Sequence, residues 1–100
     1  MSSPGDRPYR VECAALVAAS IRALFQRASQ RDKGESFVTA LMQIQERLQS
    51  NPHEFGEPLK SLAELQLEIR VAAINPLVVK YGVHDDQRVV VLQGVHLLPF

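Results

Sequence analysis

The segment LQLEIRV, residues 65–71, carries the clearest secondary-structure signal in the chain. Apolar and polar side chains alternate along it, which is the pattern of a β-strand with one buried and one solvated face. Residues 77–83 and 88–95 are rich in β-branched side chains, and turn-forming residues precede each of them at 75–76 and 84–87. These segments predict a three-stranded antiparallel meander.

Two amphipathic helices are expected upstream of the strands. Apolar residues recur at helical spacing from Ala14 onward, and again after a turn in which Gly34 suits a left-handed helix end and Ser36 suits a helix start. The second helix should end just before Pro52. Alternation over Tyr9–Cys13 predicts a short N-terminal strand. The expected fold class is α+β, with both helices packed on one face of the sheet.

Length and composition limit the classes of protein to which this chain can belong. One hundred residues suit one domain, with residues 1–8 as a flexible lead-in and residues 9–100 as the folded part. Eleven Lys and Arg residues balance eleven Asp and Glu residues, so no overall positive field would attract nucleic acid. The start of the chain lacks the apolar stretch of a signal peptide, and no apolar run is long enough for a membrane span. We expect a cytoplasmic protein with no membrane contact.

The sequence offers no pattern for a cofactor or a metal ion. The single cysteine, Cys13, has no partner for a disulfide or a zinc site, and we expect it to be a small buried hydrophobe. His53 and His84 lie in predicted connections, as expected for surface histidines. The segment 53–64, with a proline and a glycine, is expected to be an irregular connection.

Several short motifs resemble one known family. Asn-Pro at 51–52, FGEPLK at 55–60 and VKYGV at 79–83 follow one another in the predicted order of elements. This pattern is similar to that of the RelE/ParE superfamily of bacterial toxin–antitoxin toxins, and the resemblance covers about Tyr9 to Val95. It implies a RelE/ParE-like arrangement of helical hairpin and sheet. An antitoxin protein is the implied partner.

The resemblance also suggests candidate catalytic residues. Ribonuclease members of the family cut mRNA with Lys and Arg side chains on the open sheet face, assisted by a Tyr or His near the C-terminus. The matching residues here are Arg70, Lys80 and His96. However, Gln66 and Glu68 occupy positions where the family has basic residues, and a carboxylate there would repel the phosphate. These departures argue against mRNA cleavage.

The expected register brings the candidates together. Pairing about the 75–76 turn places Arg70 opposite Lys80, with Glu68 diagonal to both on the solvated face. Such a cluster is either a partly neutralised sheet surface or a remnant anion site. Tyr81 has the opposite parity and is expected in the core. Residues 89–92 are apolar at every position, so alternation leaves their inward face open.

Three functions follow from these observations. The first is a toxin-like component of a type II toxin–antitoxin system that acts by protein binding, in the manner of ParE-like proteins that poison DNA gyrase. The second is a diverged, non-toxic interaction domain that binds an antitoxin or forms a homo-oligomer, with the exposed ends of the helical hairpin and the apolar tail at 97–100 as docking surfaces. The third is a weak RelE-like mRNA endoribonuclease that acts at the ribosome.

Overall fold

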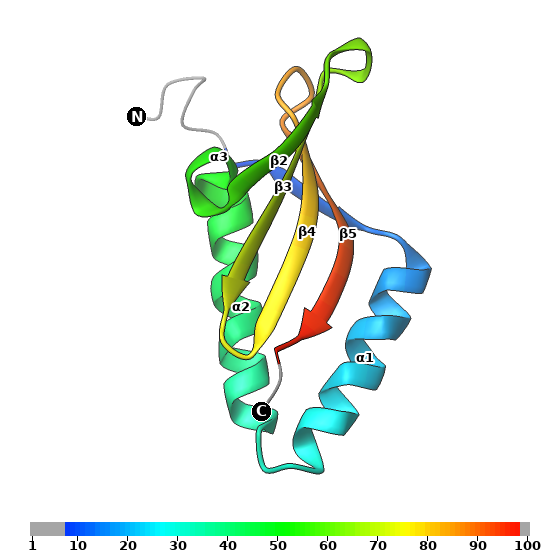
Figure 1. Cartoon of the computed structure of the whole chain (residues 1–100), viewed down its shortest axis with the longest axis vertical. Coiled ribbons are helices and arrows are strands. Elements are labelled where there is room, and N and C mark those ends of the chain that lie inside the picture. Colours follow the sequence, from blue (N-terminus) through cyan, green and yellow to red (C-terminus); the bar gives the residue numbers. More distant parts are fainter. Residues whose placement is uncertain (1–7, 99–100) are drawn as a thin grey trace.

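The computed structural model describes residues 8–98 and has an α+β fold (Figure 1). Residues 1–7 of the predicted lead-in, which was expected to span residues 1–8, lie outside the described residues, as do Pro99 and Phe100 of the predicted tail. The elements, in chain order, are β1 (Arg10–Cys13), α1 (Ala15–Ser29), α2 (Gly34–Ser50), α3 (Pro52–Phe55), β2 (Glu57–Leu62), a 3₁₀ helix (Ala63–Leu65), β3 (Leu67–Ile74), β4 (Leu77–His84) and β5 (Val89–Leu97).

The sheet has five strands in the order β1-β5-β4-β3-β2. The predicted meander is present as β3, β4 and β5, which pair antiparallel, while β1 pairs parallel with β5. The expectation of an irregular connection at 53–64 was wrong, because this segment contains α3 and β2. β2 is an exposed edge strand that contains Pro58 and shows no alternation, so its pairing with β3 stabilises a strand that local sequence does not signal.

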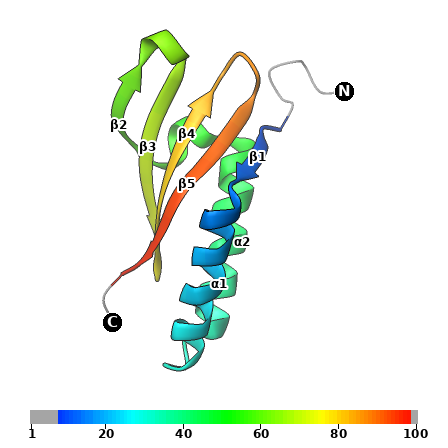
Figure 2. The same cartoon turned by 90° about the vertical axis from the view of Figure 1, so that its right-hand side faces the viewer.

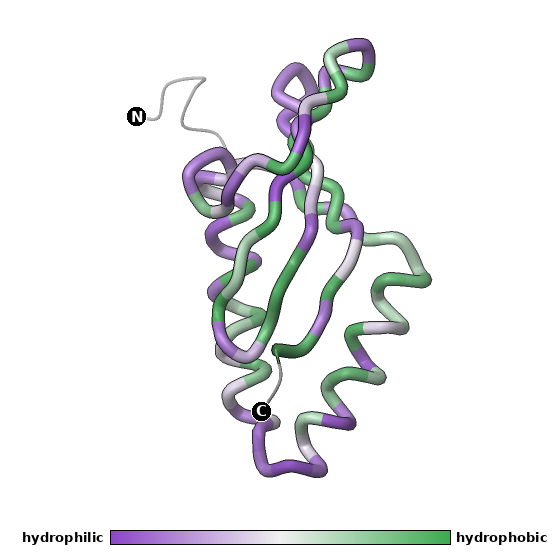
Figure 3. Tube along the Cα trace, viewed as in Figure 1, coloured by the Kyte–Doolittle hydropathy of each residue, from purple (hydrophilic) through white to green (hydrophobic). Residues whose placement is uncertain are grey.

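Both long helices cover the same face of the sheet, as predicted (Figure 2). The side chains between the two layers form the core, to which α2 and β4 contribute Phe37, Ala40, Ile44, Leu48, Leu77, Val79, Tyr81 and Val83. The central strands are coloured hydrophobic and the turn between α1 and α2 hydrophilic in Figure 3. The opposite face of the sheet carries no helix, and we call it the open face.

The turn between the helices differs in detail from the prediction. Asp32, with φ of 59°, takes the left-handed conformation, while Gly34 is the first residue of α2. Asp tolerates this conformation because its short polar side chain can bond locally to the backbone. The expected roles of Gly34 as a left-handed helix end and of Ser36 as a helix start were therefore wrong.

A change of register in β5 settles its inward face. Lys80 pairs with Gly94, and Tyr81 pairs with Leu92, so Gln93 is an extra residue on β5. Such a bulge shifts the alternation of side chains by one position. Val90 and Leu92 face the core before the bulge, and Val95 faces it afterwards.

The faces of β3 are the reverse of the prediction. Glu68 pairs with Val83 and Arg70 pairs with Tyr81, and both partners are core residues on the helix side. Because directly paired residues share a face, the charged side chains of β3 point toward the helices. Ile69 lies on the open face and is 2% exposed.

Candidate functional site

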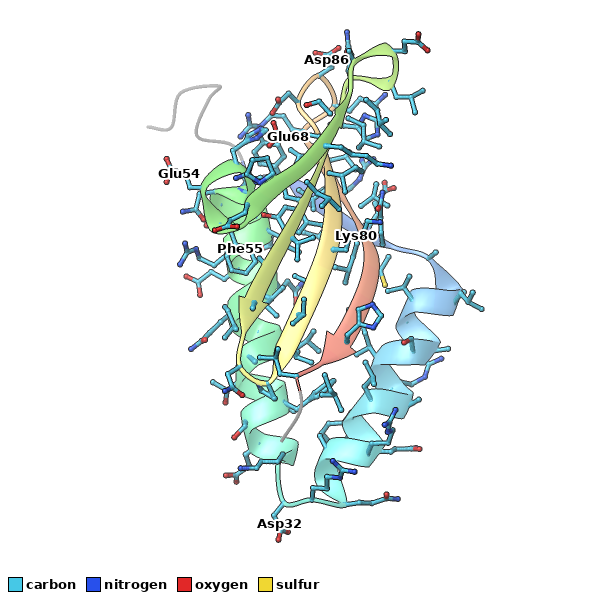
Figure 4. The ribbon with its side chains drawn as sticks, in the orientation of Figure 1. Asp32, Glu54, Phe55, Glu68, Lys80 and Asp86 are labelled. Carbon is cyan, nitrogen blue, oxygen red and sulfur yellow. The ribbon has the colours of Figure 1, made fainter. Side chains whose placement is uncertain are left out.

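A cluster of polar side chains joins four parts of the fold at the end of the sheet nearest α3. Tyr9 precedes β1, His53 belongs to α3, Glu68 and Arg70 belong to β3, and Asp85 lies in the turn between β4 and β5. We call these five residues the polar cluster. Figure 4 shows Glu68 and Asp86, the neighbour of Asp85, at this end of the molecule.

His53 is the centre of the polar cluster. Its Nε2 lies 2.6 Å from Asp85 Oδ1, and its Nδ1 lies 3.4 Å from Glu68 Oε1. The hydroxyl of Tyr9 donates to the same Asp85 oxygen over 2.9 Å. His53 therefore connects α3 to β3 and to the β4–β5 turn, and Asp85 extends the connection to the start of β1.

Arg70 anchors the other side of the cluster. Its Nη1 donates to Glu68 Oε1 and its Nη2 donates to the carbonyl of Gly56. The arginine is only 8% exposed, and its Nε is buried without a hydrogen bond to any residue of the described range. The guanidinium thus holds the chain between α3 and β2 against the sheet. Beside it, the Tyr81 hydroxyl donates to the carbonyl of Pro52 over 2.7 Å.

The titration of the cluster follows from these contacts. Desolvation lowers the pKa of His53, but the hydrogen bonds and charges of Asp85 and Glu68 outweigh it, so this pKa is raised. The hydrogen bond from Arg70 is the main cause that lowers the pKa of Glu68. Burial tends to raise the pKa of Asp85, but its bonds to His53 and Tyr9 lower it overall. Two carboxylates therefore face one imidazolium and one guanidinium.

This arrangement suits a structural connection better than catalysis. A general base needs a free lone pair directed at a substrate. Each ring nitrogen of His53 instead faces a carboxylate, and the positive charge of Arg70 is directed at Glu68 and Gly56. The cluster is internally neutralised, which lets its charged groups lie partly buried.

The structure separates the three predicted catalytic residues. Lys80 pairs with Val71, so it lies on the open face, and the predicted pairing of Arg70 with Lys80 was wrong. His96 shares the open face with Lys80, and its Nε2 lies near Gly94, the residue opposite Lys80. Two of the three candidates therefore share the open face, while Arg70 is on the other side of the sheet.

Other single-residue predictions have mixed outcomes. Tyr81 is a core residue, as predicted, with no exposed surface. Cys13 is exposed, so its expected role as a buried hydrophobe was wrong. His53 is part of the polar cluster and is not an isolated surface histidine. Leu97 is the last residue of β5 and packs against the core, so the tail at 97–100 is partly structural.

A second candidate site lies along the seam between α1 and α2. Three cavities, of about 230, 410 and 540 Å³, follow one another there. The first and second share Ile21 and Leu41, and the second and third share Phe25 and Val38. We call this continuous depression the hairpin groove. It extends from Cys13 at the end of β1 to Gly34 at the start of α2.

The hairpin groove exposes apolar side chains that the core does not cover. Phe25 is 38% exposed and Val38 is 43% exposed. Ala28 is the single fully buried residue of α1, so most of the apolar stripe of this helix is only partly covered. Arg22 also lines the groove and forms no ion pair with residues 8–98. The apolar stripes of both helices were predicted to pack on one another and on the sheet, so helical spacing alone did not predict the groove.

Within residues 8–98, no three His, Cys, Asp or Glu side chains are grouped so as to hold a metal ion. Likewise, no helix in this range combines the length and apolar character that a membrane crossing requires.

The fold and sites define a small α+β domain with a mixed five-stranded sheet. Comparison of the chain with protein-family models, with curated proteins and with solved structures found no match.

Proposed function

We propose that this chain is a toxin-like component of a type II toxin–antitoxin system, and that it acts by binding another protein. The hairpin groove is the observation that carries the proposal. A contiguous apolar depression on a small domain is typical of an interaction site. An amphipathic helix placed along the seam would cover Phe25 and Val38 with its apolar face.

The position of Arg70 favours protein binding over mRNA cleavage. Cleavage requires cationic groups that converge on the phosphate in the transition state. Here the guanidinium of Arg70 is buried in the polar cluster, which leaves Lys80 and His96 as the candidates on the open face. The mRNA endoribonuclease alternative therefore depends on these two residues.

The element order and the motifs at 51–60 and 79–83 support membership of the RelE/ParE superfamily. In this proposal the partner that neutralises the protein is an antitoxin, and the cellular target is a protein such as DNA gyrase. The remaining alternative, a non-toxic interaction domain, would use the same groove without arresting growth.

The proposal is tested by inducing the protein alone in a bacterial host and measuring growth, DNA synthesis and protein synthesis. Val38→Asp places a charge in the hairpin groove. Leu65→Asp is the matched control, because Leu65 is 62% exposed in the 3₁₀ helix and does not line the groove. A double variant, Lys80→Ala with His96→Ala, tests the open face. Arg70→Ala is unsuitable as a test of activity, because it would disrupt the fold.

We expect growth arrest in which DNA synthesis stops first, with loss of toxicity in Val38→Asp and retention in the other two variants. Arrest that begins with protein synthesis and disappears in the double variant would establish the endoribonuclease alternative. Normal growth at high soluble expression would overturn the toxin proposal and favour the non-toxic interaction domain.

A further inference from the structure

β2 covers only part of the outer edge of β3. β3 extends from Leu67 to Ile74, but its pairing with β2 ends where Val71 faces Glu57. Among the described residues, 72–74 have a strand partner on the β4 side only. We call residues 72–74 the free edge of β3. In Figure 1 this edge is the lower part of β3, beyond the point where β2 turns toward α3.

The backbone of Ala73 points away from β4 at this free edge. A Cβ added to Gly56 would lie 2.6 Å from the carbonyl oxygen of Val71, so this oxygen faces the β2 side. Backbone groups alternate in direction along a strand, so the N–H and C=O of Ala73 face the same side two residues later. Ala73 is exposed. Among the described residues, its backbone makes no hydrogen bond other than those between paired strands.

A cavity of about 420 Å³ adjoins the free edge. Its walls include Phe55, Pro58 and Leu59 as well as Ala73. The ring of Phe55 is held in place, since it stacks on Tyr81 at a centroid distance of 6.1 Å. The side chain of Leu59 is 57% exposed. An apolar side chain could therefore enter beside a rigid aromatic ring and displace water from exposed apolar surface.

The charges around this cavity favour a basic ligand. Glu57 lines the cavity, and Glu54 lies nearby on α3. Both carboxylates are exposed and neither pairs with a cation in the described part of the chain. Two cations lie close to the cavity without lining it. Arg47 lies over the Phe55 ring and bonds to Asn51, and the buried Arg70 donates to Glu68 and to the Gly56 carbonyl.

We propose that the free edge of β3 binds an extended, basic peptide segment of a partner protein. The segment adds a strand beside β3 and bonds to the N–H and C=O of Ala73. One apolar side chain of the segment enters the cavity against Phe55 and Leu59, and a neighbouring Lys or Arg pairs with Glu57. Strand addition is the recognition mode that an exposed sheet edge offers. This site is separate from the hairpin groove, and its use does not depend on toxicity.

The test uses the synthetic peptide acetyl-Lys-Val-Leu-Val-Lys-amide as the probe and follows the amide signals of the labelled protein by NMR. Two further peptides carry an N-methyl group, one on the leucine and one on the valine before it. Alternate amides of a bound strand face β3, so one methyl group blocks pairing and the other faces solvent. A fourth peptide, with Glu in place of Lys, tests the charge.

We expect saturable shifts at Gly56, Glu57, Leu59 and residues 71–74, and about tenfold weaker binding for only one of the two methylated peptides. The Glu peptide should also bind more weakly. Leu59→Glu should reduce binding, whereas Leu65→Glu, which alters an exposed leucine outside the cavity, should not. Shifts elsewhere, no saturation, or equal effects of the two methyl groups would overturn the proposal.

Discussion

At the scale of single residues, Arg70 and His53 show that chemical type does not predict role. Arg70 was predicted to be a catalytic arginine from the resemblance alone, yet it is 8% exposed and donates to Glu68 and the Gly56 carbonyl. His53 lies in a segment without any motif for an active site, yet it bonds carboxylates from two distant parts of the chain. Both residues stabilise the junction between the helices and the sheet.

The protonation of His53 predicts how stability depends on pH. Because the pKa of His53 is raised on folding from its ordinary value of 6.5, its contribution is complete below pH 6.5 and is lost as pH rises through the folded pKa. Thermal unfolding should therefore show a falling melting temperature from pH 6.5 toward alkaline pH. His53→Gln should flatten this decline, and His84→Gln should not.

At acid pH, the dependence of stability on pH has the opposite sign. The pKa values of Glu68 and Asp85 are lowered from 4.5 and 3.8, so their contribution is complete above these values and is lost as pH falls through the folded pKa values. Stability should thus be greatest between about pH 5 and pH 6.5, where both carboxylates and the imidazolium are charged. An unchanged alkaline decline in His53→Gln would contradict this role of the polar cluster.

At the scale of elements, the junction between α3 and β2 depends on close backbone approach. A Cβ on Gly56 would lie 2.6 Å from the Val71 carbonyl oxygen and 2.9 Å from the Tyr81 hydroxyl. The backbone oxygen cannot move without disturbing β3. By contrast, a Cβ on Gly34 would meet the Oγ of Ser29, at 2.9 Å, and that side chain can rotate.

We therefore predict that the same substitution lowers the free energy of unfolding by different amounts at these two glycines. Gly56→Ala should lower the free energy of unfolding by about 1–3 kcal/mol, as overpacking does. Gly34→Ala should change it by less than about 0.5 kcal/mol. Urea denaturation followed by circular dichroism measures both. Equal denaturation midpoints would show that the α3–β2 junction is less tightly packed than the contacts of Gly56 indicate.

At the scale of the whole molecule, stability is unevenly distributed between the two long helices. α2 buries Phe37, Ala40, Ile44 and Leu48, whereas α1 buries only Ala28 completely. The hairpin groove lies along α1, the helix with fewer completely buried residues. A helix with little buried apolar surface opens at a lower free energy than the rest of the fold.

Hydrogen exchange should therefore be faster in α1 than in α2 and slowest in β4, whose side chains facing the core are almost completely buried. Binding of a partner in the hairpin groove should slow exchange in α1 more than in β4, because it covers the exposed part of the apolar stripe. Uniform protection of α1 and α2 in the free protein would argue that the groove is already filled in solution.

The sequence alone determined the kinds of element and much of their order. Helical spacing identified α1 and α2, and alternation with turn residues identified β1 and the meander of β3, β4 and β5. These signals are local, because the period of apolar residues depends on backbone geometry over a few positions.

Only the tertiary structure decided which way the side chains face. The alternation in β3 is compatible with either orientation, and Glu68 and Arg70 point toward the helices because His53 and the Gly56 carbonyl supply polar partners there. The extra residue Gln93 sets the inward face of β5, where every side chain at 89–92 is apolar. His53 and Asp85 meet across 32 positions of sequence. Periodicity specifies spacing along an element, but the face that is buried depends on residues far away in the chain.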